Sequence, residues 1–179
     1  MKSKQRILKL VLSGLFLALA YILPFLTGQI REIGNMLCPM HIPVLICGFV
    51  CGPTWGLVVG FTAPLLRSLT LGMPTLFPSA VCMAFELASY GCIAGVMHRI
   101  LPKKRLYIYI SLITAMLIGR GVWGISMLTL LKISGGKFTY AAFWAGAFTK
   151  AIPGIILQII LIPIIVMILD KQKIIKTEK

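Results

Sequence analysis

Long apolar stretches alternate with short polar, Pro-rich or Gly-rich segments along the whole chain. An α-helix needs about 20 apolar residues to cross the hydrocarbon core of a bilayer, and such stretches recur about six times here. The pattern predicts an all-α integral membrane protein that forms a single transmembrane domain over residues 1–179. The six predicted transmembrane helices lie at about residues 7–26, 37–52, 54–71, 76–98, 106–131 and 140–169.

Prolines interrupt two of these stretches. The second stretch is short and carries Pro39 and Pro43 near its start. It is therefore expected to be broken or tilted, with exposed backbone groups that need partners in the protein or in a water-filled cavity. The sixth stretch carries Pro153 and Pro163, and each is predicted to kink the helix because proline removes a backbone donor and clashes with the preceding turn.

The composition supports a membrane protein. The chain is 59% hydrophobic and only 12% charged, with a mean hydropathy of +0.97. Soluble domains carry about twice that charged fraction. The formal net charge of +14 raises the alternative of a nucleic-acid partner, but the positions of the charges argue against it.

The positive charges gather in three clusters that six spans would place on one side of the membrane. Only Arg31, Lys132 and Lys137 would fall on the other side. Because cytoplasmic loops are enriched in Lys and Arg, both termini are predicted to be cytoplasmic. The basic excess then indicates contact with anionic lipid head groups rather than with nucleic acid. The clustered residues are Lys2, Lys4, Arg6, Lys9, Arg99, Lys103, Lys104, Arg105, Lys171, Lys173, Lys176 and Lys179.

Four ionisable residues lie inside the apolar stretches: Arg67, Glu86, Arg120 and Lys150. A charge at membrane depth costs at least about 2.5–3.5 kcal/mol, so it usually lines a cavity or has a partner. Counted along the helices, all four fall between the midplane and the outer third of the membrane. They predict a polar substrate pocket biased toward anionic ligands. The alternative is that these charges only form structural ion pairs.

Each charge has an expected role in such a pocket. The two guanidinium groups suit a planar anion because each presents a fork of donors, and the Lys150 ammonium offers a further charged donor. Glu86 would accept from a substrate hydroxyl or amine, or would hold one arginine in place. Asn35 and His41 lie at the predicted outer mouth and could add neutral hydrogen bonds.

Two tryptophans, Trp123 and Trp144, lie toward the outer ends of the last two predicted spans. A substrate ring could stack on them. The alternative is that they belong to the aromatic belt at the membrane interface.

Pairs of small residues four positions apart allow helices to approach closely. The pairs in the third and fourth predicted spans are expected to serve internal packing. For Gly14 and Ala18, in the first span, docking of a partner protein is a close alternative to internal packing. The internal pairs are Gly56 with Gly60 and Gly91 with Gly95.

Two stretches of the sequence carry a family resemblance. They are Met40-His41-Ile42-Pro43-Val44, and then Cys51-Gly52-Pro53-Thr54-Trp55-Gly56 with Gly60-Phe61. The chain resembles the substrate-binding S component of energy-coupling factor (ECF) vitamin transporters, especially pantothenate-like or pyridoxine-like members. The resemblance extends over the six predicted spans and is distinctive across about residues 34–95.

The resemblance implies a function. S components bind a vitamin with high affinity near the extracellular side and associate with a membrane scaffold subunit and two cytoplasmic ATPase subunits. Gly14 and Ala18 stand where the family has a small-residue docking motif, with glycine in place of one alanine. ATP hydrolysis is expected only in the partners, and this chain has no GxxxxGK[ST] motif. The resemblance also implies a bacterial plasma membrane and no cofactor.

Three other classes of protein fit the pattern less well. An enzyme would need a nucleophile with a base, paired carboxylates or a metal set, and two histidines with one buried carboxylate supply none of these. A transition-metal permease would use Cys38, Met40 and His41, which suit a soft ion such as Cu(I), although the deeper cations would repel a metal. A stand-alone small-molecule carrier or channel is the remaining alternative.

Overall fold

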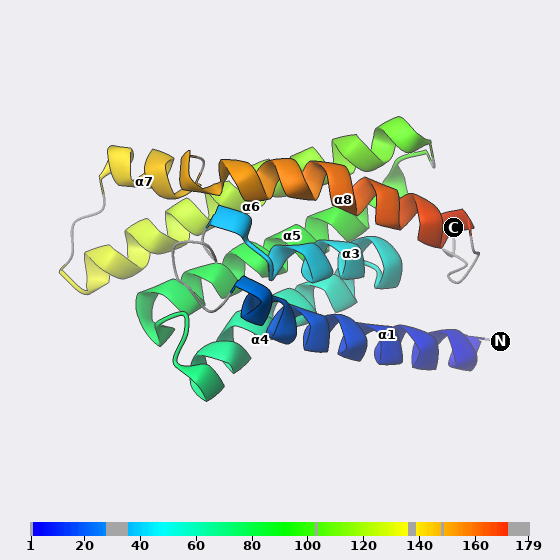
Figure 1. Ribbon diagram of the computed structural model, residues 1–179, viewed down its shortest axis with the longest axis horizontal. Coiled ribbons are helices and arrows are strands. Elements are labelled where there is room, and N and C mark those ends of the chain that lie inside the picture. Colours follow the sequence, from blue (N-terminus) through cyan, green and yellow to red (C-terminus); the bar gives the residue numbers. More distant parts are fainter. Residues whose placement is uncertain (1, 28–35, 103, 136–138, 148, 172–179) are drawn as a thin grey trace.

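The computed structural model describes residues 2–27, 36–102, 104–135, 139–147 and 149–171. Within these ranges every regular element is helical, which confirms the all-α prediction. The long helices run close together along one direction (Figure 1). They are α1 (Lys2–Ile22), α3 (His41–Cys51), α4 (Pro53–Leu71), α5 (Val81–Ile100), α6 (Arg105–Ile133) and α8 (Ile152–Lys171). The short elements are η1 (Leu23–Thr27), η2 (Leu76–Ala80), α7 (Tyr140–Ala147) and η3 (Thr149–Ala151).

The second predicted span is broken near its prolines, as expected: Met36 and Leu37 are helical, residues 38–40 are not, and α3 begins at His41. Pro39 precedes the helix, and Pro43 lies in its first turn, where the missing N–H removes no intrahelical bond. The helix is only 11 residues long. It ends at Gly52, whose φ of 98° is a conformation that residues with a Cβ rarely adopt.

The sixth predicted span is not one helix. The short helix α7 and the η3 turn precede α8, and Pro153 is the second residue of α8. The prediction that Pro153 kinks a continuous helix is therefore wrong, because at a first turn proline opens a helix without losing a bond. Pro163 does lie inside α8.

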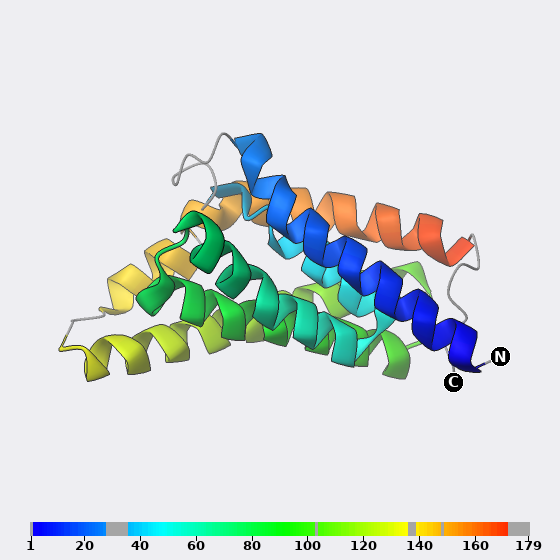
Figure 2. The same ribbon diagram turned by 90° about the horizontal axis from the view of Figure 1, so that it is seen from below.

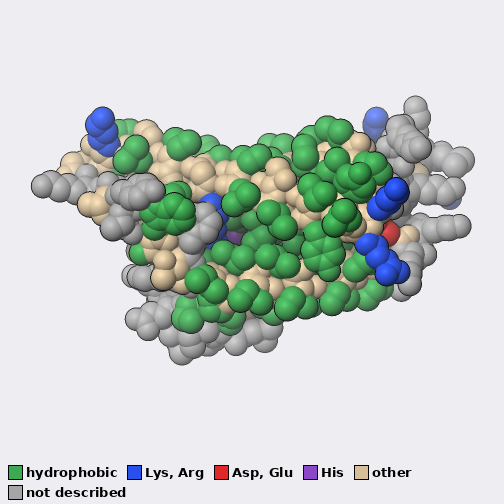
Figure 3. All heavy atoms as spheres, turned by 90° about the horizontal axis from the view of Figure 1, so that it is seen from above, with side chains coloured by type: hydrophobic (Ala, Val, Ile, Leu, Met, Phe, Trp, Pro, Cys, Tyr) green, Lys and Arg blue, Asp and Glu red, His purple; other side chains and the backbone are tan. Residues whose placement is uncertain are grey.

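Four helical segments are long and apolar enough to cross a membrane: Lys4–Phe25, Leu76–Ile100, Arg105–Ile133 and Ile152–Asp170. The apolar helix α3 is shorter than a span requires, and α4 has 19 residues that include the buried Arg67. The chain is thus a multi-pass membrane protein. Hydrophobic side chains also cover most of its visible surface (Figure 3).

The centre of the bundle is a glycine-lined contact between α3, α4 and α5. A Cβ added at Gly91 of α5 would meet the backbone of Gly56 in α4, and one at Gly56 would meet the backbone of Gly91. A Cβ at Gly60 would meet the backbone of Leu87, and one at Gly95 would lie 2.5 Å from the nitrogen of Pro53. The prediction that these glycines serve internal packing is confirmed.

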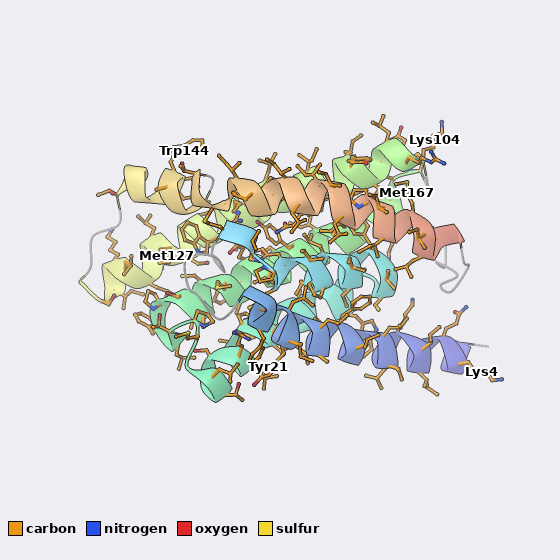
Figure 4. The ribbon with its side chains drawn as sticks, in the orientation of Figure 1. Lys4, Tyr21, Lys104, Met127, Trp144 and Met167 are labelled. Atoms are coloured by element: carbon orange, nitrogen blue, oxygen red, sulfur yellow. The ribbon has the colours of Figure 1, made fainter. Side chains whose placement is uncertain are left out.

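The first residues of α1 and the last residues of α8 lie at the same end of the bundle in both ribbon views (Figures 1 and 2). Lys4 and Lys104 are found at that end, whereas Trp144 and Met127 lie at the opposite one (Figure 4). The helices therefore bring the basic N-terminal and mid-chain clusters together. Which side of the membrane this end faces stays a prediction.

Candidate functional site

Glu86 and Arg120 form an ion pair in the interior of the bundle. Glu86 projects from α5 and Arg120 from α6, and the Glu86 Oε1 and Arg120 Nη1 atoms are 2.9 Å apart. The two residues are 1% and 6% exposed. The Arg120 Nη1 atom therefore binds Glu86. Among the described residues, Glu86 is the only buried carboxylate.

Two ring side chains complete the surroundings of the carboxylate. The His41 Nε2 atom, at the first residue of α3, lies 3.5 Å from Glu86 Oε1. Tyr90 lies one helical turn after Glu86 on α5, and its ring centroid is 5.3 Å from that of His41. Both residues are buried. Three helices therefore converge on one carboxylate.

Cys38 binds Arg120 from the segment that precedes α3. The Arg120 Nη2 atom donates to the Cys38 Sγ atom over 3.7 Å. Cys38 has a φ of 47°, an uncommon value for a residue with a Cβ. We call Cys38, His41, Glu86, Tyr90 and Arg120 the polar cluster.

Gln158 of α8 is a further buried polar residue, 1% exposed. It lies on the inward face of α8, with Gly154 one turn before it and Ile162 one turn after it. A Cβ added at Gly154 would lie 2.5 Å from the Met36 carbonyl oxygen and 2.8 Å from the Leu37 carbonyl carbon. The face of α8 that carries Gln158 therefore packs on the segment that leads into the polar cluster.

Several polar atoms of this region have no hydrogen-bond partner within the described part of the chain. They are the His41 Nδ1 atom, the Arg120 Nε atom and both side-chain amide atoms of Gln158. Leaving a buried polar group unsatisfied costs about 1–3 kcal/mol, so such atoms are rare and usually meet water or a ligand. The arrangement can present both donors and acceptors to a small molecule.

The polar cluster lies far from the end that carries the termini. Glu86 is 14 residues before the last residue of α5, which corresponds to about 21 Å along the helix. Arg120 is 15 residues after the first residue of α6, or about 22 Å. Figure 3 shows Lys or Arg and His atoms in a depression between hydrophobic side chains. Both depths place the cluster in the half of the bundle opposite the termini.

Arg67 is buried, but its described contacts are with the end of α1. The Arg67 Nη1 atom donates to the Tyr21 carbonyl oxygen over 2.9 Å, and the Arg67 Cζ atom lies 5.0 Å from the centroid of the Phe25 ring. The Tyr21 hydroxyl is also 3.1 Å from the Thr70 Oγ1 atom. The arginine therefore joins α4 to α1, and its assignment to substrate binding stays a prediction.

The remaining predicted site residues have described contacts with residues outside the polar cluster or lie outside the described part of the chain. Trp123 stacks on Phe143 of α7, with ring centroids 6.3 Å apart, and Trp144 is 45% exposed. Asn35 lies outside the described residues, as does the side chain of Lys150. The substrate roles of these four residues stay predictions.

The sequence interpretation missed Cys38, Tyr90 and Gln158 as members of the site. Tyr90 carried a usable signal, because it follows Glu86 by four residues and so shares its helix face. Gln158 also carried one, since it is a polar residue inside an apolar stretch of the last predicted span. Cys38 carried none, because a single buried cysteine usually acts as a small hydrophobe.

Within the described residues, no three side chains of the types His, Cys, Asp and Glu are grouped so that they could hold a metal ion. Cys38 and His41, the expected soft ligands, instead face the guanidinium and carboxylate of the ion pair. A cation next to a thiol opposes metal binding there. The geometry thus gives no support to a transition-metal permease.

Comparison with known proteins gives one match. A family model described as "ECF transporter, substrate-specific component" matches residues 8–166, which is most of the chain. Neither a curated protein nor a solved structure matches it.

Proposed function

The chain belongs to the ECF transporter substrate-specific component family, and on that basis we propose that it is the high-affinity binding subunit for a small water-soluble vitamin or vitamin precursor. Membership makes it the substrate-specific subunit of an ECF transporter. The observation that carries the finer proposal is the polar cluster, a set of buried hydrogen-bonding groups in an otherwise apolar bundle. Pantothenate-like and pyridoxine-like compounds are the favoured substrate classes.

The proposed arrangement has six spans in a bacterial plasma membrane. Two of them are α3 and α4, which are shorter or less apolar than the four helical segments that can cross a membrane by length and composition. Both termini are cytoplasmic, because the basic residues gather at their end of the bundle. The polar cluster then lies in the extracellular half of the membrane. This placement suits a binding protein that takes its substrate from outside.

The energy for uptake is proposed to come from partner proteins, namely a membrane scaffold subunit and two cytoplasmic ATPase subunits. This chain is proposed to have no enzymatic activity of its own. The docking face is assigned to α1, where Gly14 and Ala18 are exposed while Phe16 and Ala20 face the core. A Cβ added at Gly14 would meet no atom within 4 Å, so the chain leaves this surface open for a close partner.

Ligand binding is tested by thermal unfolding of the purified protein in detergent with a panel of water-soluble vitamins and metal ions. We expect one vitamin class to raise the melting temperature, because a ligand at 100 times its dissociation constant adds about 2.7 kcal/mol of stability. Tyr90→Phe removes a buried hydroxyl of the polar cluster and should weaken binding of that vitamin about tenfold, the value of a lost hydrogen bond of roughly 1.4 kcal/mol. Tyr107→Phe, in the first turn of α6, is the matched control.

Different outcomes identify the competing functions. A rise in melting temperature with metal ions alone, which disappears in His41→Ala, would favour a metal permease. Vitamin uptake into vesicles that contain only this chain would favour a stand-alone carrier. If the melting temperature stays unchanged with every vitamin, the proposed function is contradicted.

Docking is tested by the double substitution Gly14→Leu and Ala18→Leu. Because both positions are exposed, we expect the melting temperature and vitamin binding to stay unchanged. Vitamin uptake into cells that contain the ECF partners should be lost, since two large side chains would keep the helices apart. Gly121→Leu is the matched control, because a Cβ added at Gly121 also meets no atom within 4 Å. Normal uptake by the double variant would place the docking surface elsewhere.

A further inference from the structure

We propose that this site selects a net-neutral ligand with hydroxyl, amide or ring-nitrogen groups that both donate and accept hydrogen bonds, and that Gln158 determines this selectivity. The inference rests on the proposed function and narrows its substrate class. It favours the pyridoxine-like class over carboxylate vitamins such as pantothenate.

The first argument is charge balance in the polar cluster. Its one guanidinium and one carboxylate are 2.9 Å apart, so their charges of +1 and −1 cancel when the imidazole is neutral. A second guanidinium, that of Arg67, is engaged by the Tyr21 carbonyl and the Phe25 ring. Arg67 keeps its own positive charge, because those partners are neutral, but within the polar cluster itself the positive and negative charges balance.

The second argument is the cost of an added anion. A substrate carboxylate would lose its hydration on entry, and it would need a cation to compensate. The Arg120 Nη1 atom binds Glu86 and the Arg120 Nη2 atom donates to Cys38, so among the Arg120 nitrogens only Nε has no described partner. A new carboxylate would also lie near Glu86, where like charges repel. The cluster thus disfavours a ligand that is neutral elsewhere but ends in a carboxylate.

The third argument is the chemistry of the unpartnered atoms. The Gln158 side chain has an oxygen that accepts and a nitrogen that donates, and neither has a partner within the described residues. Such an amide can bond at the same time to a donor and an acceptor on one neutral molecule. The His41 Nδ1 atom is a further polar atom without a partner within the described residues.

The placement of Gln158 connects it to the cluster. Gly154, one turn before it on the same face of α8, packs on the backbone of Met36 and Leu37. The next residue, Cys38, binds Arg120. A ligand between α8 and the start of α3 would therefore meet the amide of Gln158 on one side and the cluster on the other.

Three matched pairs of compounds test the charge selectivity: panthenol with pantothenate, pyridoxine with 4-pyridoxate, and nicotinamide with nicotinate. In each pair a neutral group replaces a carboxylate on the same scaffold. Affinities are measured by calorimetry on the detergent-solubilised full chain at pH 8. We expect the neutral member of the accepted scaffold to bind at least about tenfold tighter, since a buried unpaired charge costs more than one hydrogen bond.

Gln158→Leu tests the role of the amide. Affinity for the neutral ligand should fall about tenfold or more, because the ligand groups would face an apolar side chain. The melting temperature without ligand should stay the same or rise, since the substitution removes two unsatisfied buried atoms. A purely structural glutamine would lower it. Ser111→Ala is the control, because the Ser111 hydroxyl already donates to the Tyr107 carbonyl oxygen over 2.7 Å.

The outcomes separate this inference from the proposed function. Tighter binding of the carboxylate member would overturn the inference and leave the vitamin-binding function intact. Unchanged affinity in Gln158→Leu would overturn the assignment of Gln158. Absence of binding by all six compounds and by every other vitamin would overturn both.

Discussion

Glu86→Gln is expected to lower the free energy of unfolding by about 3–5 kcal/mol, because it leaves the guanidinium of Arg120 buried without its counter-charge. The ion pair is 2.9 Å long and both residues are at least 94% buried, so water cannot replace the lost carboxylate. The substitution preserves side-chain volume, and the loss therefore reports charge rather than packing. Thermal and denaturant unfolding of the ligand-free protein in detergent would measure it.

The double variant Glu86→Met with Arg120→Met is the control for this interpretation. Replacing both partners of a buried ion pair by apolar residues is often neutral or stabilising, so most of the stability should return. Ligand binding should nevertheless be lost in the double variant if the polar cluster is the binding site. A Glu86→Gln variant as stable as the wild type would show that the pair contributes nothing to the fold.

Gly91→Ala is expected to be the second severe substitution, and it should lower the free energy of unfolding by about 3 kcal/mol. The added Cβ would collide with the backbone of Gly56, and a backbone cannot rotate away as a side chain can. Overpacking of a filled core usually costs about 1–3 kcal/mol, and contact with a backbone belongs at the upper end of that range. The yield of folded protein and the melting temperature would both report the effect.

Gly121→Ala on α6 is the matched control for this prediction. A Cβ there meets no atom within 4 Å, and alanine is the better helix former by about 0.5–1 kcal/mol. Its melting temperature should be unchanged or slightly raised. Equal stability of the two variants would contradict the close packing of α4 on α5.

Much of the helical arrangement could be predicted from the sequence. Each predicted span overlaps one of the long helices. The turn at Gly52 and the internal packing of Gly56, Gly60 and Gly91 follow from residue type and spacing. The sixth span was the main error, because Pro153 at a predicted kink can equally open a new helix. Spacing alone does not distinguish these two effects of proline.

The buried charges show the limit of sequence reasoning more clearly. Depth along a helix follows from residue number, so Arg67, Glu86 and Arg120 were correctly expected to be buried. Depth leaves the rotation of each helix undetermined. A change of one residue turns a side chain by about 100°, and therefore the sequence could not show that Arg120 reaches Glu86 while Arg67 reaches the Tyr21 carbonyl.

The sequence by itself determined that this is an all-helical membrane protein with charged groups inside its apolar bundle. Hydrophobicity and helix length are local properties, and they need no knowledge of neighbouring helices. The tertiary structure decided which groups meet: Cys38 and His41 at the ion pair, and Gln158 on the inward face of α8. Those contacts join residues as many as 82 positions apart, and they depend on how close the glycine contacts allow the helices to pack.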